Sequence, residues 1–213
     1  PIVVCSLGDG AMTEGEISEA LQMAVLHKYP IIYLVQDNGW DISASAKETR
    51  AMDATEFAKG FKGLETRSID GTDFTKCFET LEEIIAKVRK ERRPFLVHAK
   101  VPLLNHHTSG VRKEWYRPKE ELAEHFSRDP LPKMRDEMRR MKFEEKDLLE
   151  IEKKAKQKVL ADFEKAVQAA EPEPSDLYTH TFAPTPITEE KGERNPKNGN
   201  VVVMVDAALH AID

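Results

Sequence analysis

Two short polar turns carry the residue types that could bind a diphosphate and its metal ion. Gly8-Asp9-Gly10-Ala11 follows an apolar run and precedes a helical pattern, so its backbone amides and the helix N-terminus can face a phosphate. Taken alone, such a turn is equally typical of an ordinary strand-to-helix connection. The second turn, Asp37-Asn38-Gly39, directly follows another apolar run.

The two turns should meet at one edge of a sheet. Because parallel strands end at the same edge, we expect Asp9 and Asn38 to lie close together. A carboxylate oxygen, an amide oxygen and a free backbone carbonyl in the next turn are hard ligands, which Mg²⁺ takes alongside diphosphate oxygens and water. The pair of turns therefore predicts a site for a diphosphate with Mg²⁺.

The first third of the sequence alternates strand and helix patterns, as a βαβ unit does. Apolar runs at 1–7 and 31–35 predict buried strands. Between them a helix is expected from about Glu14 to His27, with Pro30 ending it. Thr13, with Glu16 three residues later, forms a capping-box pattern at the start of this helix. The apolar face of the helix consists of residues at helical spacing, namely Ile17, Ala20, Leu21, Ala24 and Val25.

The same alternation continues through a second helix at 74–89, after the turn Asp70-Gly71, and a third strand at 94–99. These patterns favour a doubly wound α/β class, with a parallel sheet and flanking helices. Beyond it we expect a charged helical extension at 119–170 and a proline-rich linker at 171–200. A new apolar pattern at 201–213 predicts the start of a second folding unit, and the α/β part then occupies 1–118.

Composition excludes several classes of protein. The chain has 213 residues, 40% hydrophobic and 33% charged, which suits a globular domain with appendages. A formal net charge of −6 gives no general basic surface for nucleic acid or acidic membranes. Two cysteines provide neither a disulfide framework nor zinc-ligand spacing, and no apolar run approaches the length of a membrane span. We therefore expect a soluble protein of a reducing cytoplasm.

A family resemblance follows from the turns and from longer stretches of sequence. Gly8-Asp9-Gly10, with Asn38-Gly39 twenty-nine residues after Asp9, resembles the thiamine-diphosphate motif of the transketolase superfamily. The stretches 8–16, 38–43, 70–73, 106–109 and 115–117 resemble the α part of the decarboxylating component of 2-oxoacid dehydrogenase complexes. The nearest member is the branched-chain, or 2-oxoisovalerate, enzyme. The resemblance covers roughly residues 1–140 and implies a thiamine-diphosphate-binding α/β fold, present here in part, plus a helical C-terminal extension.

The resemblance implies roles for individual residues. Asp9 and Asn38 match the Mg²⁺ ligands, and Trp40 matches a position that contributes its backbone carbonyl. The glycines of the first turn, Gly8 and Gly10, are implied to bind the cofactor, and so is Ala11; the backbone amides of Gly10 and Ala11 match those that meet the diphosphate. The resemblance therefore implies thiamine diphosphate as the cofactor and Mg²⁺ as its metal ion.

A later loop supplies two further residues. His107 matches the active-site histidine that precedes the loop serine phosphorylated in mitochondrial members, and Arg117 matches the arginine of that loop's Tyr-Arg pair. Without the resemblance, a pair such as His106-His107 is more often a structural, polar loop feature than a catalytic one. Thr108 stands where the phosphorylated serine lies. Two other departures are Asp37, where the family usually has Asn, and Trp40, where it usually has Tyr.

The implied reaction is oxidative decarboxylation of a branched-chain 2-oxo acid, with transfer of the acyl group to a lipoyl-bearing acyltransferase component. Residues 201–213 resemble the start of the β part, so we expect a fragment of an α–β fusion. The parent would form a homodimer, and the upstream α region and downstream β region would complete the site. The fragment alone should be inactive. Pyruvate or acetoin dehydrogenase types and a non-catalytic phosphate-binding or assembly module remain alternatives.

Overall fold

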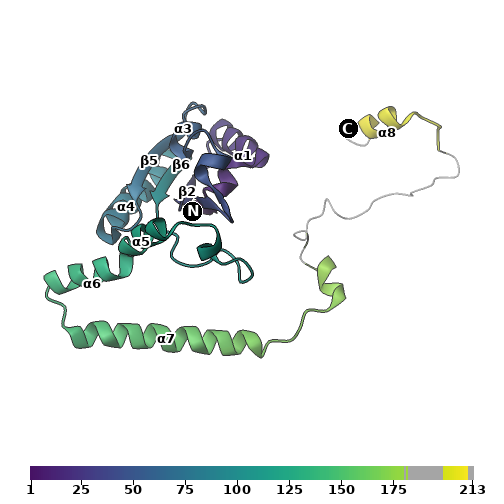
Figure 1. Cartoon of the computed structure of the whole chain (residues 1–213). Helices are drawn as coiled ribbons and strands as arrows, with labels where there is room; N and C mark the ends of the chain where they lie inside the picture. The colour runs from purple at the N-terminus through teal and green to yellow at the C-terminus, as the bar shows by residue number, and fades with distance from the viewer. Residues whose placement is uncertain (180, 182–198, 211–213) are drawn as a thin grey trace. The chain divides into compact units, whose positions relative to one another are not determined.

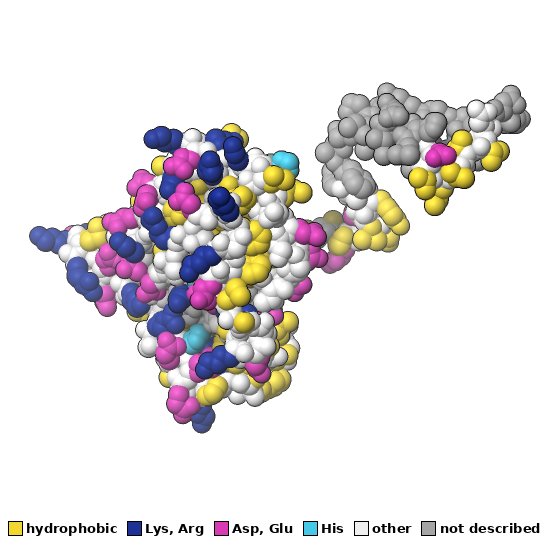
Figure 2. Space-filling model, turned by 90° about the horizontal axis from the view of Figure 1, so that it is seen from above, with side chains coloured by type: hydrophobic (Ala, Val, Ile, Leu, Met, Phe, Trp, Pro, Cys, Tyr) yellow, Lys and Arg dark blue, Asp and Glu magenta, His cyan; other side chains and the backbone are white. Residues whose placement is uncertain are grey.

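The computed structural model describes residues 1–179, 181 and 199–210 (Figure 1). It divides the chain into two units, 1–155 and 156–213, and each is described by itself. The first unit contains the sheet and every residue of the predicted site. On the face shown in Figure 2, basic and acidic side chains are interspersed.

The first unit is built on a four-stranded parallel sheet. Its strands are β1 (Val3–Gly8), β2 (Ile31–Asp37), β5 (Glu65–Asp70) and β6 (Phe95–Lys100), in the order β1-β2-β6-β5. The three strands expected from apolar runs are confirmed, but the expected burial of the first is wrong, because β1 lies at one edge of the sheet and most of its residues are exposed. β5 was not anticipated, because it occupies a sheet edge and its sequence is mostly polar. In register, Gly8 pairs with Gln36, so β1 and β2 end together.

Helices cover both faces of the sheet, as a doubly wound arrangement requires. On one face, α1 (Gly15–Leu26) and α3 (Ala54–Ala58) pack over side chains that include Tyr33, Val35 and Leu96. On the other, α4 (Phe74–Glu91) packs over a cluster with Ile32 and Val97. Figure 1 shows α1 and α4 on opposite sides of the strands. The predicted α/β class is confirmed.

The start of α1 differs from the sequence prediction. Residues Gly10–Thr13 form a 3-10 helix, η1, and the Thr13 hydroxyl donates to the Gly10 carbonyl at 2.7 Å. α1 then begins at Gly15, with Glu14 at the N-cap position and no side-chain cap. The capping box between Thr13 and Glu16 is therefore wrong, because η1 already engages the threonine hydroxyl.

A small hairpin follows β2 and carries the chain back over the sheet edge. It comprises β3 (Trp40–Asp41) and β4 (Ala44–Ser45), and leads into the one-turn helix α2 (Ala46–Thr49). Gly39 has a φ of +79°, which glycine adopts without strain. A capping box between Ser45 and Glu48 starts α2. This hairpin brings residues 46–50 back toward the ends of β1 and β2.

The remaining described elements are helical. They are η2 (Lys113–Trp115), α5 (Lys119–Ser127), α6 (Pro130–Arg140), α7 (Glu145–Val167), η3 (Pro174–Tyr178) and α8 (Met204–His210). Most of the predicted linker at 171–200 and the last residues of 201–213 lie outside the described residues. The segment limits drawn from the sequence therefore stay predictions. None of the described helices combines the length and apolar character needed to span a bilayer.

Candidate functional site

The Gly-Asp-Gly turn places a buried carboxylate at the carboxyl edge of the sheet. Asp9 connects β1 to η1 and is 3% exposed. Its Oδ1 accepts a hydrogen bond from the Asn38 backbone N–H at 3.2 Å. The matched ends of β1 and β2 account for this contact between residues far apart in sequence. The structure thus brings together Asp9 and Asn38.

A third turn residue follows directly. The Trp40 N–H donates to the Asn38 Oδ1 at 3.0 Å, which folds residues 38–40 into a tight turn. Gly10 contributes by lacking a side chain, since a Cβ there would lie 2.6 Å from the Asp41 Cγ. Because the first amides of a helix have no intrahelical acceptor, the amides of Gly10 and Ala11 at the start of η1 are suited to a ligand.

Arg50 joins two carboxylates at this edge. Its Nη1 lies 2.7 Å from the Asp9 Oδ2, and its Nη2 lies 2.8 Å from the Asp37 Oδ1. The Arg50 side chain is only 12% exposed. Sequence reasoning missed Arg50, because only the β3–β4 hairpin brings this residue over Asp9, and no spacing in the sequence signals that return.

Asp37 is held from a second side by a buried histidine. The Nε2 of His98, on β6, lies 2.7 Å from the Asp37 Oδ2, and His98 is fully buried. The Asp37 Oδ1 also accepts the Gly39 N–H at 2.9 Å. Burial by itself would raise the pKa of Asp37, but the hydrogen bond to His98 and the charge of Arg50 outweigh burial and hold the pKa well below its usual value.

The electrostatics of Asp9 run in the opposite direction. Burial and the neighbouring Asp37 carboxylate raise the pKa of Asp9, although Arg50 and the Asn38 N–H oppose that rise. Two adjacent carboxylates thus share one guanidinium.

The side chain of Trp40 connects this turn to α5. Its indole Nε1 donates to the Glu121 Oε1 at 2.6 Å, and the Arg117 guanidinium lies 5.3 Å from the ring centroid. Arg117 is buried and donates to Glu121 and to the Leu103 carbonyl, at 3.0 Å and 3.2 Å. The structure therefore places Arg117 next to Trp40. Glu121, which holds both side chains, was not anticipated.

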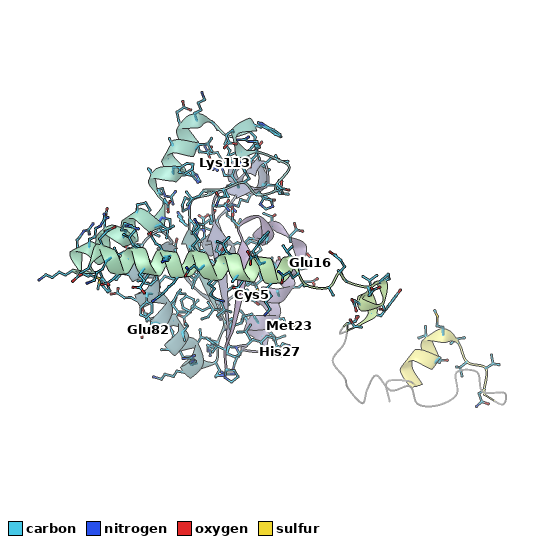
Figure 3. All side chains as sticks on the ribbon, turned by 90° about the horizontal axis from the view of Figure 1, so that it is seen from below. Cys5, Glu16, Met23, His27, Glu82 and Lys113 are labelled. Atoms are coloured by element: carbon cyan, nitrogen blue, oxygen red, sulfur yellow. The ribbon has the colours of Figure 1, made fainter. Side chains whose placement is uncertain are left out.

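The predicted catalytic histidine lies apart from these contacts. His107 is exposed in the segment between β6 and η2, and its ring makes no hydrogen bond with a described residue. Its neighbour His106 accepts the Lys113 N–H at 3.2 Å. Lys113 itself is buried and hydrogen-bonded to the Leu104 carbonyl, and Figure 3 labels it. The catalytic role of His107 stays a prediction.

Comparison with known families decides the family of this chain. A family model described as dehydrogenase E1 component matches residues 1–175. The chain belongs to the dehydrogenase E1 component family.

Individual relatives of this E1 chain carry two kinds of name. The 3-methyl-2-oxobutanoate dehydrogenase subunit alpha of Mycobacterium tuberculosis (strain CDC 1551 / Oshkosh) is 30% identical over 63% of this chain and 36% of its own. The mitochondrial 2-oxoisovalerate dehydrogenase subunit alpha of Bos taurus is 24% identical over 91% of this chain and 43% of its own. The pyruvate dehydrogenase E1 component subunit alpha of Rickettsia bellii is 28% identical over 83% of this chain and 54% of its own. This chain thus spans from about a third to about half of these relatives.

The oxygen donors of this E1 chain fit a magnesium ion chemically. The Asp9 carboxylate, the Asn38 amide oxygen and the Trp40 carbonyl belong to two adjoining turns, and Mg²⁺ accepts all three types of oxygen. The Asn38 Oδ1 retains a second lone pair beside its hydrogen bond to Trp40. The described residues hold no group of three or more His, Cys, Asp or Glu side chains suited to a metal. A Mg²⁺ site here would therefore rely on the amide, the carbonyl and the ligand's phosphate oxygens.

Proposed function

We propose that this chain is the cofactor-binding α part of a thiamine-diphosphate-dependent and Mg²⁺-dependent E1 component that decarboxylates a branched-chain 2-oxo acid. The observation that carries the proposal is the contact between buried Asp9 and Asn38 at the carboxyl edge of the sheet, in a chain of the E1 family. The M. tuberculosis and bovine relatives, both named for a branched-chain 2-oxo acid, favour 2-oxoisovalerate as the substrate.

The residues of the turns would bind and orient the cofactor. Asp9, Asn38 and the Trp40 carbonyl would hold Mg²⁺, and the amides of Gly10 and Ala11 would donate to the diphosphate. Gly8 keeps the end of β1 free of a side chain. When bound, thiamine diphosphate supplies a carbanion that adds to the 2-oxo carbon and an electron sink that allows carbon dioxide to leave.

We propose roles at the mouth of the site for two residues of the later segment. Arg117 is fixed by Glu121 beside Trp40, so its positive charge is positioned at the metal turn. His107, on the exposed segment, would accept or donate a proton at its imidazole and contact the lipoyl group. Exposure of His107 suits a group that meets an incoming partner.

The complete protein would act with partners that this chain does not contain. We propose that the acyl group passes to a lipoyl-bearing acyltransferase component, and that an α–β fusion forming a homodimer in the cytoplasm completes the site. This chain alone would then lack decarboxylase activity. Turnover of a 2-oxo acid by the purified 213-residue chain would contradict that proposal.

The second candidate is an E1 component acting on pyruvate, favoured by the R. bellii relative. An acetoin-cleaving enzyme would use the same cofactor site with another substrate. A phosphate-binding assembly module would bind ADP as well as thiamine diphosphate. Comparing kcat/KM for 2-oxoisovalerate, pyruvate and acetoin in the complete protein separates the three enzymes.

The decisive experiment is a calorimetric titration of the complete protein with thiamine diphosphate, with and without Mg²⁺. Asp9→Asn keeps the shape of the side chain but removes its charge, and Glu19→Ala on the exposed surface of α1 is the matched control. We expect Mg²⁺-dependent binding in the native protein and in Glu19→Ala, and none in Asp9→Asn. Equal binding of ADP, or no binding by the native protein, would refute the proposed function.

A further inference from the structure

We infer that Arg50 is an internal cation that occupies the metal-binding carboxylate in the absence of Mg²⁺ and releases it when Mg²⁺ binds. The inference deepens the proposed function and rests on the Mg²⁺ site proposed there. It assigns Arg50 as a positioning residue that sets the metal affinity of the site, and Asp37 as the carboxylate on which Arg50 remains.

Both oxygens of the Asp9 carboxylate already have one partner. The Oδ1 accepts the Asn38 N–H at 3.2 Å, and the Oδ2 lies 2.7 Å from the Arg50 Nη1. A dication on either oxygen would face the guanidinium across one buried carboxylate, where like charges repel strongly. Mg²⁺ and Arg50 therefore compete for the same carboxylate.

Without a metal ion, the two carboxylates need another positive partner. The side chains of Asp9 and Asp37 are 4% and 13% exposed, and both point at Arg50. Buried carboxylates without a positive partner are costly. Arg50 supplies that partner to both at once, so the metal-free turn keeps its shape.

The Arg50 guanidinium can move away from Asp9 without losing all of its partners. Its Nη2 is bonded to Asp37 independently of Asp9, at 2.8 Å, so the guanidinium can leave one carboxylate and keep the other. Arg50 lies at the C-terminal end of the short helix α2 and lines a cavity of about 260 Å³. Asp53 lines the same cavity. The displaced guanidinium thus has both space and a charge partner.

The test compares Arg50→Gln with native protein and with Arg67→Gln, which breaks an exposed ion pair to Glu83 and serves as the matched control. Mg²⁺ alone is titrated into the complete protein by calorimetry, and thermal unfolding is followed with and without Mg²⁺. We expect Arg50→Gln to bind Mg²⁺ about tenfold more tightly, within the usual range of coupling between two binding events. Without Mg²⁺, the Tm of Arg50→Gln should be lower than that of native protein. The increase in Tm on adding Mg²⁺ should be larger for Arg50→Gln than for native protein. Arg67→Gln should match the native affinity.

A measurement on native protein keeps the inference testable if Arg50→Gln does not fold. Modification by phenylglyoxal, read by mass spectrometry at residue 50, should increase when Mg²⁺ is added, and modification at Arg67 should not change. Metal binding that is unchanged or weaker in Arg50→Gln, or Mg²⁺-independent modification of Arg50, would overturn this inference alone. Absence of Mg²⁺ binding in native protein and Arg50→Gln, with and without thiamine diphosphate, would overturn the proposed Mg²⁺ site and the inference together.

Discussion

A methyl group added at Gly10 has no room beside the β3–β4 hairpin. The Cβ of an alanine at this position would lie 2.6 Å from the Asp41 Cγ, 2.7 Å from its Oδ1 and 3.0 Å from its Cβ. Carbon atoms in favourable contact are about 3.5–4.0 Å apart. Either Asp41 or the η1 turn must therefore move, and overpacking of this kind costs about 1–3 kcal/mol.

Gly8→Ala is the matched control in the same turn, because a Cβ at Gly8 would meet no atom within 4 Å. Both substitutions reduce the entropy of the unfolded chain, a stabilisation of about 0.4–1 kcal/mol that cancels between them. We therefore expect Gly10→Ala to be less stable than Gly8→Ala by about 1–3 kcal/mol. At about 2–4 °C per kcal/mol, this difference is a gap in Tm of roughly 2–12 °C.

Thermal unfolding of the two variants, followed by circular dichroism, checks the expected gap. Adding Asp41→Ala to Gly10→Ala removes the two closest contacts and should recover most of the lost stability, as coupled neighbours do. Equal Tm values for Gly8→Ala and Gly10→Ala, or no recovery in the double variant, would refute the reasoning that a close approach of the hairpin requires glycine at position 10.

Two further predictions concern α5. Burial lowers the pKa of His125 below its ordinary 6.5, and its Nδ1 accepts the Leu103 N–H at 2.8 Å. As the pH falls, His125 of the unfolded chain takes up a proton before His125 of the folded chain, so the free energy of unfolding should be constant above about pH 6.5 and fall below it. Urea midpoints measured from pH 5 to 7.5 should show this fall. The same pH profile in His125→Asn would contradict the prediction. Trp40→Phe removes the hydrogen bond to the Glu121 carboxylate and should cost about 1.5–3 kcal/mol in urea unfolding. Trp115→Phe, at a position that is 70% exposed, should change the free energy of unfolding little. Equal losses of stability in the two variants would contradict a stabilising contact between Trp40 and Glu121.

The sheet was predictable where a strand consists of an apolar run. β2 and β6 are apolar runs bounded by turns, and most of their residues are buried or half-buried. β1 is an apolar run as well, but it lies at a sheet edge and is mostly exposed, so its sequence predicted the strand and not its exposure. β5 reads Glu-Thr-Arg-Ser-Ile-Asp, and only Ile69 of its side chains is buried. An edge strand of this composition has no apolar run, so its pairing with β6 is a tertiary outcome that periodicity does not signal.

The candidate site was predictable to the extent that sheet topology determines it. Asp9 lies at the end of β1 and Asn38 at the end of β2, and these strands are parallel. Because parallel strands end at the same edge of a sheet, their sequence positions predicted the contact between the two residues. Arg50 and Glu121 escaped prediction, because each reaches the site through a segment that folds back over the edge. Their positions depend on hairpin geometry and helix packing, which the spacing of residues does not specify.

The charges at the sheet edge explain why the cofactor and its metal would be bound as a unit. The formal charges of Asp9, Asp37 and Arg50 sum to minus one in a largely buried cluster, in which His98 also bonds to Asp37. A divalent cation added to this cluster reverses the sign, and a buried excess of positive charge is as unfavourable as the negative one it replaces. A diphosphate presented to the amides of Gly10 and Ala11 returns the balance toward neutrality. Mg²⁺ and diphosphate therefore each favour the binding of the other here, and Arg50 provides the charge balance when both are absent.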